Sequence, residues 1–103
     1  MRPLDVRLRD AALSDLAEIF SYIAERSSDR VAERYIERLM MACERIGLAP
    51  EGGTARGDLR PGLRLWAFER RAVICYSIEG DAVFVARIVH RGRDLDALDW
   101  TLS

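Results

Sequence analysis

RAVICYSIEGDAVFVARIV, residues 71–89, decides the fold. Glu79-Gly80-Asp81 divides it into two apolar segments, and such a division is typical of a tight turn between antiparallel strands. Both segments carry apolar side chains at odd and at even positions. Side chains point alternately to the two faces of a strand, so this pattern predicts strands that are covered on both faces. We therefore predict two central strands, at residues 71–78 and 82–89.

A third strand precedes this pair. Residues 63–68, LRLWAF, lead through Glu69-Arg70 into the strand at 71–78, so the three segments are expected to form an antiparallel meander. Residues 48–62 contain two prolines and four glycines, and this composition predicts a loop.

Two helices are expected before the sheet. Residues 4–8 alternate between apolar and polar and predict a short strand. Apolar residues at helical spacing then predict a first helix from Asp10, a candidate N-cap, to Arg26. A second helix is predicted from Ser28 or Asp29, the candidate caps, to Gly47, a candidate helix stop. The short link predicts an antiparallel hairpin. The predicted buried stripes are Leu13, Leu16, Ile19, Phe20 and Ile23, with Asp15, Glu18 and Glu25 outside the stripe, and then Val31, Tyr35, Leu39, Ala42 or Cys43, and Ile46.

These elements predict the α+β class. We expect an N-terminal strand, an antiparallel helical hairpin and a three-stranded antiparallel meander, in the order β-α-α-β-β-β and in one domain, residues 1–103. The first strand should pair with one of the later three, and the sequence leaves open which one. The hairpin can cover one face of the central strands. The other face needs a cover from the C-terminal tail (about residues 94–103), from another chain, or from both.

The charge is unevenly distributed along the chain. All 16 basic residues are arginine, and the formal net charge is −1. Residues 56–93 hold eight arginines and four acidic residues (8 − 4 = +4), whereas residues 94–103 hold three acidic residues and no base (−3). The C-terminal half thus offers either an ordinary solvated surface or a site for a polyanion or an acidic partner.

Few side chains could transfer protons in catalysis. Arginine, with a pKa above about 12, cannot do so near neutral pH, and the chain has no lysine. His90 is the single histidine. If the strand continues to His90, strict alternation places it on the face of Phe84, Ala86 and Ile88, and places Arg87 on the opposite face with Val83, Val85 and Val89. A structural role for His90 is therefore favoured, and no residue is assigned to catalysis.

No cluster of histidine and cysteine predicts a metal site, and no cofactor is expected. Cys43 and Cys75 lie far apart in apolar surroundings, which favours buried thiols in a reducing compartment. The sequence shows no signal peptide and no apolar stretch of about 18 residues, so we expect a soluble, cytoplasmic protein.

Four motifs, taken together and in order, resemble a known family. They are DLAEIFSYIAE (15–25), ERIGLAPEGG (44–53), DLRPGLR (58–64) and RIVHRGRDL (87–95). In this order and at these separations the chain resembles the ParE branch of the RelE/ParE toxin superfamily of bacterial toxin–antitoxin modules. The resemblance covers nearly the whole chain and implies the same β-α-α-β-β-β fold.

The resemblance also implies a function. ParE-like toxins inhibit DNA gyrase, and a ParD-like antitoxin neutralises them by wrapping a segment over the toxin, so we expect a hetero-oligomer with an antitoxin. The residues expected to contact gyrase are Arg87, His90, Arg93, Asp94 and Trp100. The residues expected to contact the antitoxin are Leu16, Phe20, Ile36, Met40, Leu63, Leu65, Trp66 and Tyr76.

The alternatives that stay open are a RelE-like mRNA interferase and an inactive member that only binds its antitoxin. RelE-like relatives cleave mRNA on the ribosome, and here His90 with Arg64 and Arg87 would have to act. The lack of lysine and the acidic tail depart from that pattern.

Overall fold

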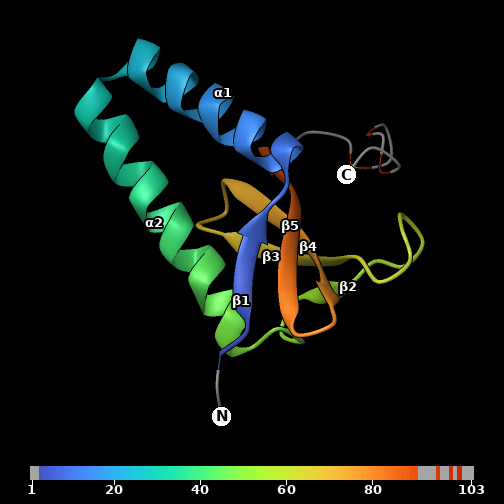
Figure 1. Ribbon diagram of the computed structural model, residues 1–103. Helices are drawn as coiled ribbons and strands as arrows, with labels where there is room; N and C mark the ends of the chain where they lie inside the picture. The colour runs from blue at the N-terminus through green and yellow to red at the C-terminus, as the bar shows by residue number, and fades with distance from the viewer. Residues whose placement is uncertain (1–2, 91–94, 96–97, 99, 101–103) are drawn as a thin grey trace.

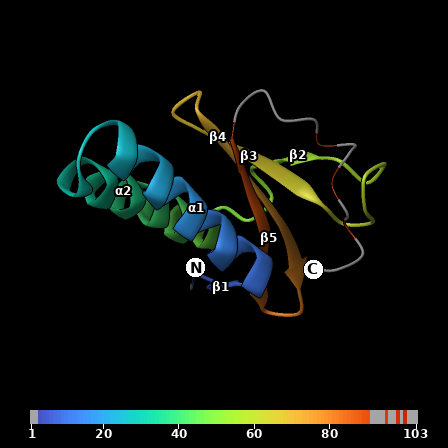
Figure 2. The same ribbon diagram turned by 90° about the horizontal axis from the view of Figure 1, so that it is seen from above.

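The computed structural model describes residues 3–90 and residues 95, 98 and 100. Within them, a helical hairpin lies to one side of a single sheet (Figures 1 and 2). The elements are β1 (Asp5–Leu8), α1 (Asp10–Arg26), α2 (Asp29–Leu48), β2 (Thr54–Ala55), β3 (Arg64–Phe68), β4 (Ala72–Glu79) and β5 (Ala82–His90). The predicted α+β class and the predicted order of its elements are confirmed.

The sheet has the strand order β1-β5-β4-β3-β2. The strands from β2 to β5 pair antiparallel, as the meander predicts, and β1 runs parallel to β5, with Asp5 opposite Ala82 and Leu8 opposite Val85. This pairing answers the question that the sequence left open. The prediction of an unbroken loop was wrong at Thr54 and Ala55, which pair with Leu65 and Arg64.

The two helix starts differ in how they are capped. The side chain of Ser28 accepts a hydrogen bond from the backbone N–H of Val31 at 3.1 Å, which confirms the predicted cap of α2. The predicted cap of α1 is wrong, because Asp10 is already the first helical residue and Arg9 before it makes no side-chain cap. The Asp10 carboxylate instead lies in the first turn, where a negative charge is favourable.

Gly47 does not stop α2, which continues to Leu48. A Cβ atom at this position would lie 2.5 Å from the carbonyl oxygen of Leu4. The backbone N–H of Leu4 donates to the Gly47 carbonyl at 2.9 Å, so the segment entering β1 runs directly against the helix. Glycine is needed here for this close backbone approach and not for a helix end.

A larger core fills the space between the helices and the sheet. Its fully buried side chains come from α2 and from the central strands: Leu39, Ile46, Ile74, Tyr76, Val83 and Val85. The predicted stripes were wrong at Leu13 and Val31, which are 51% and 46% exposed. They were wrong also at Asp15, which is buried, because α1 turns Ala12, Asp15 and Ile19 toward the sheet.

A smaller core lies on the opposite face of the sheet. Leu63, Cys75 and Val89 pack there with Trp100, and Leu95 and Leu98 flank them. The indole N–H of Trp100 donates to the Leu95 carbonyl oxygen at 3.0 Å. The described residues of the C-terminal tail therefore supply the cover that the two-sided apolar strands required.

Candidate functional site

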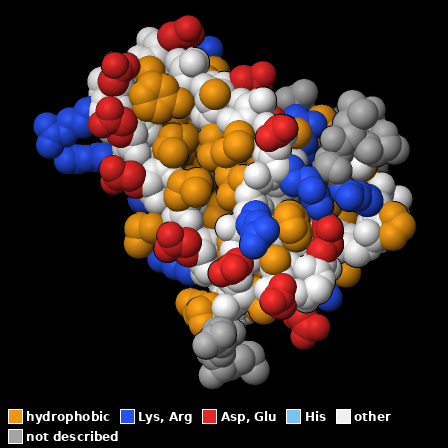
Figure 3. All heavy atoms as spheres, in the orientation of Figure 1, with side chains coloured by type: hydrophobic (Ala, Val, Ile, Leu, Met, Phe, Trp, Pro, Cys, Tyr) orange, Lys and Arg blue, Asp and Glu red, His pale blue; other side chains and the backbone are white. Residues whose placement is uncertain are grey.

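An apolar surface lies along the outward seam between the two helices. Figure 3 shows hydrophobic side chains gathered over α1 and α2. Half-buried Leu16 and Phe20 from α1 and Ile36 and Met40 from α2 lie at helical positions beside the buried stripes, and exposed Leu13 continues the α1 row. We call these five residues the hairpin patch. Exposed apolar area of this kind is typical of a site for another chain.

The four residues expected from the sheet to contact an antitoxin have different positions. Leu65 and Trp66 of β3 are half-buried and pack against opposite cores. Leu63 and Tyr76 are buried, with 1% and 0% exposed. The Tyr76 hydroxyl accepts from the Gly53 N–H at 2.9 Å and donates to the Pro50 carbonyl at 2.7 Å. Leu63 and Tyr76 are therefore core residues that stabilise the fold, and the prediction that they contact an antitoxin was wrong.

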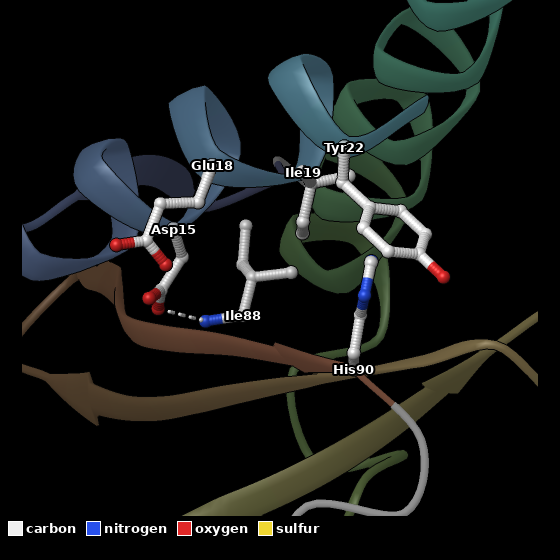
Figure 4. Close-up of a pocket in the computed structure, with 6 residues that line it drawn as sticks. All are labelled: Asp15, Glu18, Ile19, Tyr22, Ile88 and His90. Atoms are coloured by element: carbon white, nitrogen blue, oxygen red, sulfur yellow. Dashed lines mark hydrogen bonds between the residues drawn. The ribbon is translucent and has the colours of Figure 1, made fainter. Parts of the chain in front are cut away.

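Asp15 and Arg87 form an ion pair between α1 and β5. Arg87 donates from Nε and Nη2 to the two carboxylate oxygens at 2.8 and 2.9 Å. The Ile88 N–H donates to Asp15 Oδ2 at 2.8 Å, and Figure 4 marks this hydrogen bond with a dashed line. The hydrogen bonds with Asp15 raise the pKa of Arg87 above its usual value. The guanidinium of Arg87 is thus engaged inside the protein and is not directed toward a target.

A β-bulge separates the two halves of β5. Cys75 lies opposite Arg87, but Tyr76 lies opposite Val85, so Ala86 is left over. Val83, Val85 and Ile88 consequently all face the helices, and the predicted strict alternation was wrong. The predicted separation of Arg87 from His90 holds, because both residues follow the bulge and lie an odd number of positions apart.

His90 ends β5 on the helix side of the sheet. Its ring meets Tyr22 edge-on, with centroids 5.8 Å apart. The two residues line a cavity of about 170 Å³ together with Asp15, Glu18, Ile19 and Ile88 (Figure 4). Glu18 adds a carboxylate to this cavity, whereas that of Asp15 is engaged by Arg87.

Arg64 is held elsewhere. Its Nη1 donates to the carbonyl oxygens of Glu51 and Gly53 at 3.1 and 2.9 Å, which fixes the loop before β3. His90, Arg64 and Arg87, the three residues that RNA cleavage would require, are therefore not brought together. Of the remaining residues expected to contact gyrase, Trp100 is buried, and Arg93 and Asp94 lie outside the described residues.

Burial also decides the chemistry of the thiols. It raises the pKa of Cys43 to about 11 and that of Cys75 to about 12, so both are packing residues near neutral pH.

Across the described part of the chain, no group of three or more potential metal ligands occurs. No helix in that part is long and apolar enough to span a membrane.

The buried position of Asp15 and a pocket with several arginines beneath the hairpin tip were not predicted from the sequence. Asp15 could have been found from its spacing, because Ala12, Asp15 and Ile19 also form a helical row. The pocket has no local signal, since Tyr35 and Arg71 come from different elements, α2 and the turn between β3 and β4.

The sequence and the fold are both similar to those of known proteins. The family model described as the ParE toxin of the type II toxin–antitoxin system, parDE, matches residues 6–95. Toxin ParE3 of Caulobacter vibrioides is 31% identical over 83 residues, which are 81% of this chain and 82% of that protein.

A solved structure shares the fold. It is the chromosomal ParDE TA system from P. aeruginosa, with a TM-score of 0.75 and 17% sequence identity over 84% of this chain and 95% of that chain. The family match spans most of the chain. The chain belongs to the ParE family of toxins of type II toxin–antitoxin systems.

Proposed function

We propose that this toxin inhibits DNA gyrase and that a ParD-like antitoxin neutralises it by binding the hairpin patch. The row of half-buried apolar side chains along the helix seam supports the proposed antitoxin binding (Figure 3). An amphipathic segment laid over it would bury apolar area worth about 25 cal/mol per Å². The name of the structural neighbour, a ParDE system, supports a partner of the ParD type.

The proposed inhibition is non-catalytic. Cleavage of RNA through its own 2′-hydroxyl needs a base and an acid near one phosphate. In the described residues, Arg87 is bound to Asp15, Arg64 is bound to loop carbonyls, and His90 faces Tyr22. This arrangement supports inhibition through surface contact and does not favour the interferase alternative.

The proposed gyrase contact lies at the His90 end of β5. His90 is half-buried beside a cavity, and Arg93 and Asp94 follow it in sequence, so these three residues remain our candidates. Arg87 and Trp100 are assigned to support, because one is paired with Asp15 and the other fills the smaller core. Gyrase as the target would place the site of action in the cytoplasm.

The test is a supercoiling assay with purified gyrase, relaxed plasmid and toxin. We expect inhibition that rises with toxin concentration and is relieved by a stoichiometric amount of antitoxin. His90→Ala should weaken inhibition, and Arg30→Gln, an exposed change on α2, serves as its control. Normal supercoiling at a large excess of wild-type toxin would refute the proposal. Ribosome-dependent cleavage of mRNA that disappears in His90→Ala would establish the interferase alternative.

A further inference from the structure

A pocket opens beneath the tip of the hairpin, on the side that faces the sheet. Two adjoining cavities of about 330 and 250 Å³ share Ile23, Tyr35 and Arg71 in their linings. The larger is completed by Tyr22, Arg70 and His90, and the smaller by Val31, Arg34 and Arg38. We call the two together the hairpin-tip pocket. Arg34 leaves α2 on a different side from Ile36, because two helical positions are about 200° apart, so the pocket is separate from the hairpin patch.

Tyr35 is a buried residue in the lining of both cavities. The side chain is 3% exposed, and its ring packs edge-on against Phe68 with centroids 5.5 Å apart. The hydroxyl is buried and has no hydrogen-bond partner among the residues that the structure describes. Buried hydroxyls nearly always have a partner, because losing water without replacement costs about 1–3 kcal/mol. Burial also raises the pKa of Tyr35, so the group is a neutral donor.

Four arginines bring positive charge to the lining. Arg34 and Arg38 come from α2, and Arg70 and Arg71 come from the turn between β3 and β4. The carboxylate of Glu69 lies beside them, but Arg38 already donates to both its oxygens at 2.8 and 3.2 Å. A neutral donor beside arginines is the surrounding that a single anionic group prefers.

The turn between β3 and β4, which carries Arg70 and Arg71, has an unusual backbone. Glu69 and Arg70 both adopt positive φ angles, 48° and 58°. Consecutive residues in this conformation form the tight turn favoured between antiparallel strands, where asparagine and glycine are the usual residues. Here the two positions hold the charged residues Glu69 and Arg70, and Arg70 and the following Arg71 both line the pocket.

We propose that the hairpin-tip pocket receives one carboxylate of the antitoxin, with Tyr35 donating a hydrogen bond and Arg71 forming the ion pair. This inference rests on the proposed function, since it names the chemistry by which the same partner is anchored at a second point. The segment that covers the hairpin patch would continue past the tip and place an acidic residue in the pocket.

A peptide carboxylate fits better than a phosphate of DNA. Ile23 and Val31 make part of the lining apolar, which suits an acidic side chain with its methylene groups. A duplex would also bring many phosphates to a hairpin in which residues 10–48 hold eight acidic residues, among them the exposed Glu25, Glu33 and Glu37, against five arginines. Repulsion along that surface opposes a polyanion but leaves room for one carboxylate.

Two conservative variants test the proposal by calorimetric titration with a ParD-type antitoxin. Tyr35→Phe keeps the ring and removes the hydroxyl, and Arg71→Gln removes the charge. Each should weaken antitoxin binding at least about tenfold, as expected for a lost hydrogen bond to a charged group. Arg45→Gln, an exposed change on α2 away from the pocket, should bind within about twofold of wild type. Tyr35→Phe should melt no lower than wild type, because no described residue of the free toxin forms a hydrogen bond with this hydroxyl.

The partner carboxylate can then be identified by replacing the acidic residues of the antitoxin with their amides, one at a time. One of these replacements should weaken antitoxin binding to the wild-type toxin but have little further effect on antitoxin binding to Arg71→Gln. Wild-type affinity in both toxin variants would overturn the inference and leave the proposed function intact. No binding of antitoxin to wild-type toxin would instead defeat the proposed function. Variants that bind antitoxin normally but inhibit gyrase poorly would assign the pocket to the target and also overturn the inference.

Discussion

Asp15 and Arg87, 72 positions apart in sequence, are joined through two hydrogen bonds where α1 crosses the end of β5. The side chain of Asp15 is 7% exposed and that of Arg87 is 18% exposed. β1 pairs with β5 only as far as Val85, so the Ile88 N–H beyond it has no strand partner on that edge and donates to Asp15 instead. One carboxylate therefore completes the edge of the sheet and attaches the hairpin that carries the patch.

Removal of this carboxylate should destabilise the protein strongly. Asp15→Ala leaves a largely buried guanidinium and a buried N–H without their partner, and such losses cost about 3–5 kcal/mol. We expect urea unfolding to show a decrease of this order. Glu18→Gln, one turn further on the exposed surface, should change the free energy of unfolding by less than about 0.5 kcal/mol. Equal stability of the two variants would contradict the role assigned to Asp15.

Gly47 gives a second test of how the hairpin is attached. Gly47→Ala places a Cβ atom 2.5 Å from the Leu4 carbonyl oxygen and 3.1 Å from Val6 Cγ2. The forced shift of β1 should cost about 1–3 kcal/mol, less the gain of about 1 kcal/mol from the better helix former. In Gly57→Ala the added Cβ meets no atom of the described residues within 4 Å, so the stability of this variant should remain within about 0.5 kcal/mol of wild type. Thermal unfolding of both variants decides between close packing and a helix-end role.

Much of this fold could be predicted from local patterns. Residues 71–89 predict a strand pair through two short apolar segments divided by a turn, and Ser28 predicts a helix start through its hydroxyl. These signals are local, because each depends on neighbours within a few positions. They also sufficed to show that the second face of the sheet needs a cover.

The relationships between distant segments could not be predicted. A parallel edge strand such as β1 has no turn that fixes its partner, and the bulge at Ala86 follows from packing and not from composition. The predicted buried stripe on α1 was wrong for the same reason, because it too depends on contacts with distant segments. A carboxylate at a core-facing position is favourable only because Arg87 and the Ile88 N–H meet it from another element.

The buried thiols predict a loss of stability in alkali. The pKa of Cys43 is raised from 9.0 to about 11, and that of Cys75 from 9.0 to about 12. Below pH 9 both thiols are protonated in the folded and in the unfolded state, so their contribution to stability is complete. Above pH 9 the unfolded state loses these protons before the folded state does. The free energy of unfolding should fall by up to about 1.4 kcal/mol per pH unit and thiol until the folded pKa is reached.

Urea unfolding at pH 8, 9 and 10 measures this slope. The double variant Cys43→Ala, Cys75→Ala should show a shallower decline than wild type, although Tyr35 and Tyr76, whose pKa values burial also raises, preserve part of it. Rapid modification of either thiol by a disulfide reagent at pH 8 in the folded protein would contradict the burial on which the prediction depends.

Met40 and Met41 provide a matched pair for the hairpin patch. Met40 is half-buried at the helix seam, whereas Met41 is 55% exposed and points about 100° away from it. A carboxylate at position 40 would lose its water when an apolar segment covers the seam, so Met40→Glu should weaken antitoxin binding at least about tenfold. Met41→Glu adds the same charge to the same helix and should bind within about twofold of wild type. Circular dichroism would first establish that both variants are folded. If Met41→Glu weakens binding and Met40→Glu does not, the antitoxin covers another face of α2.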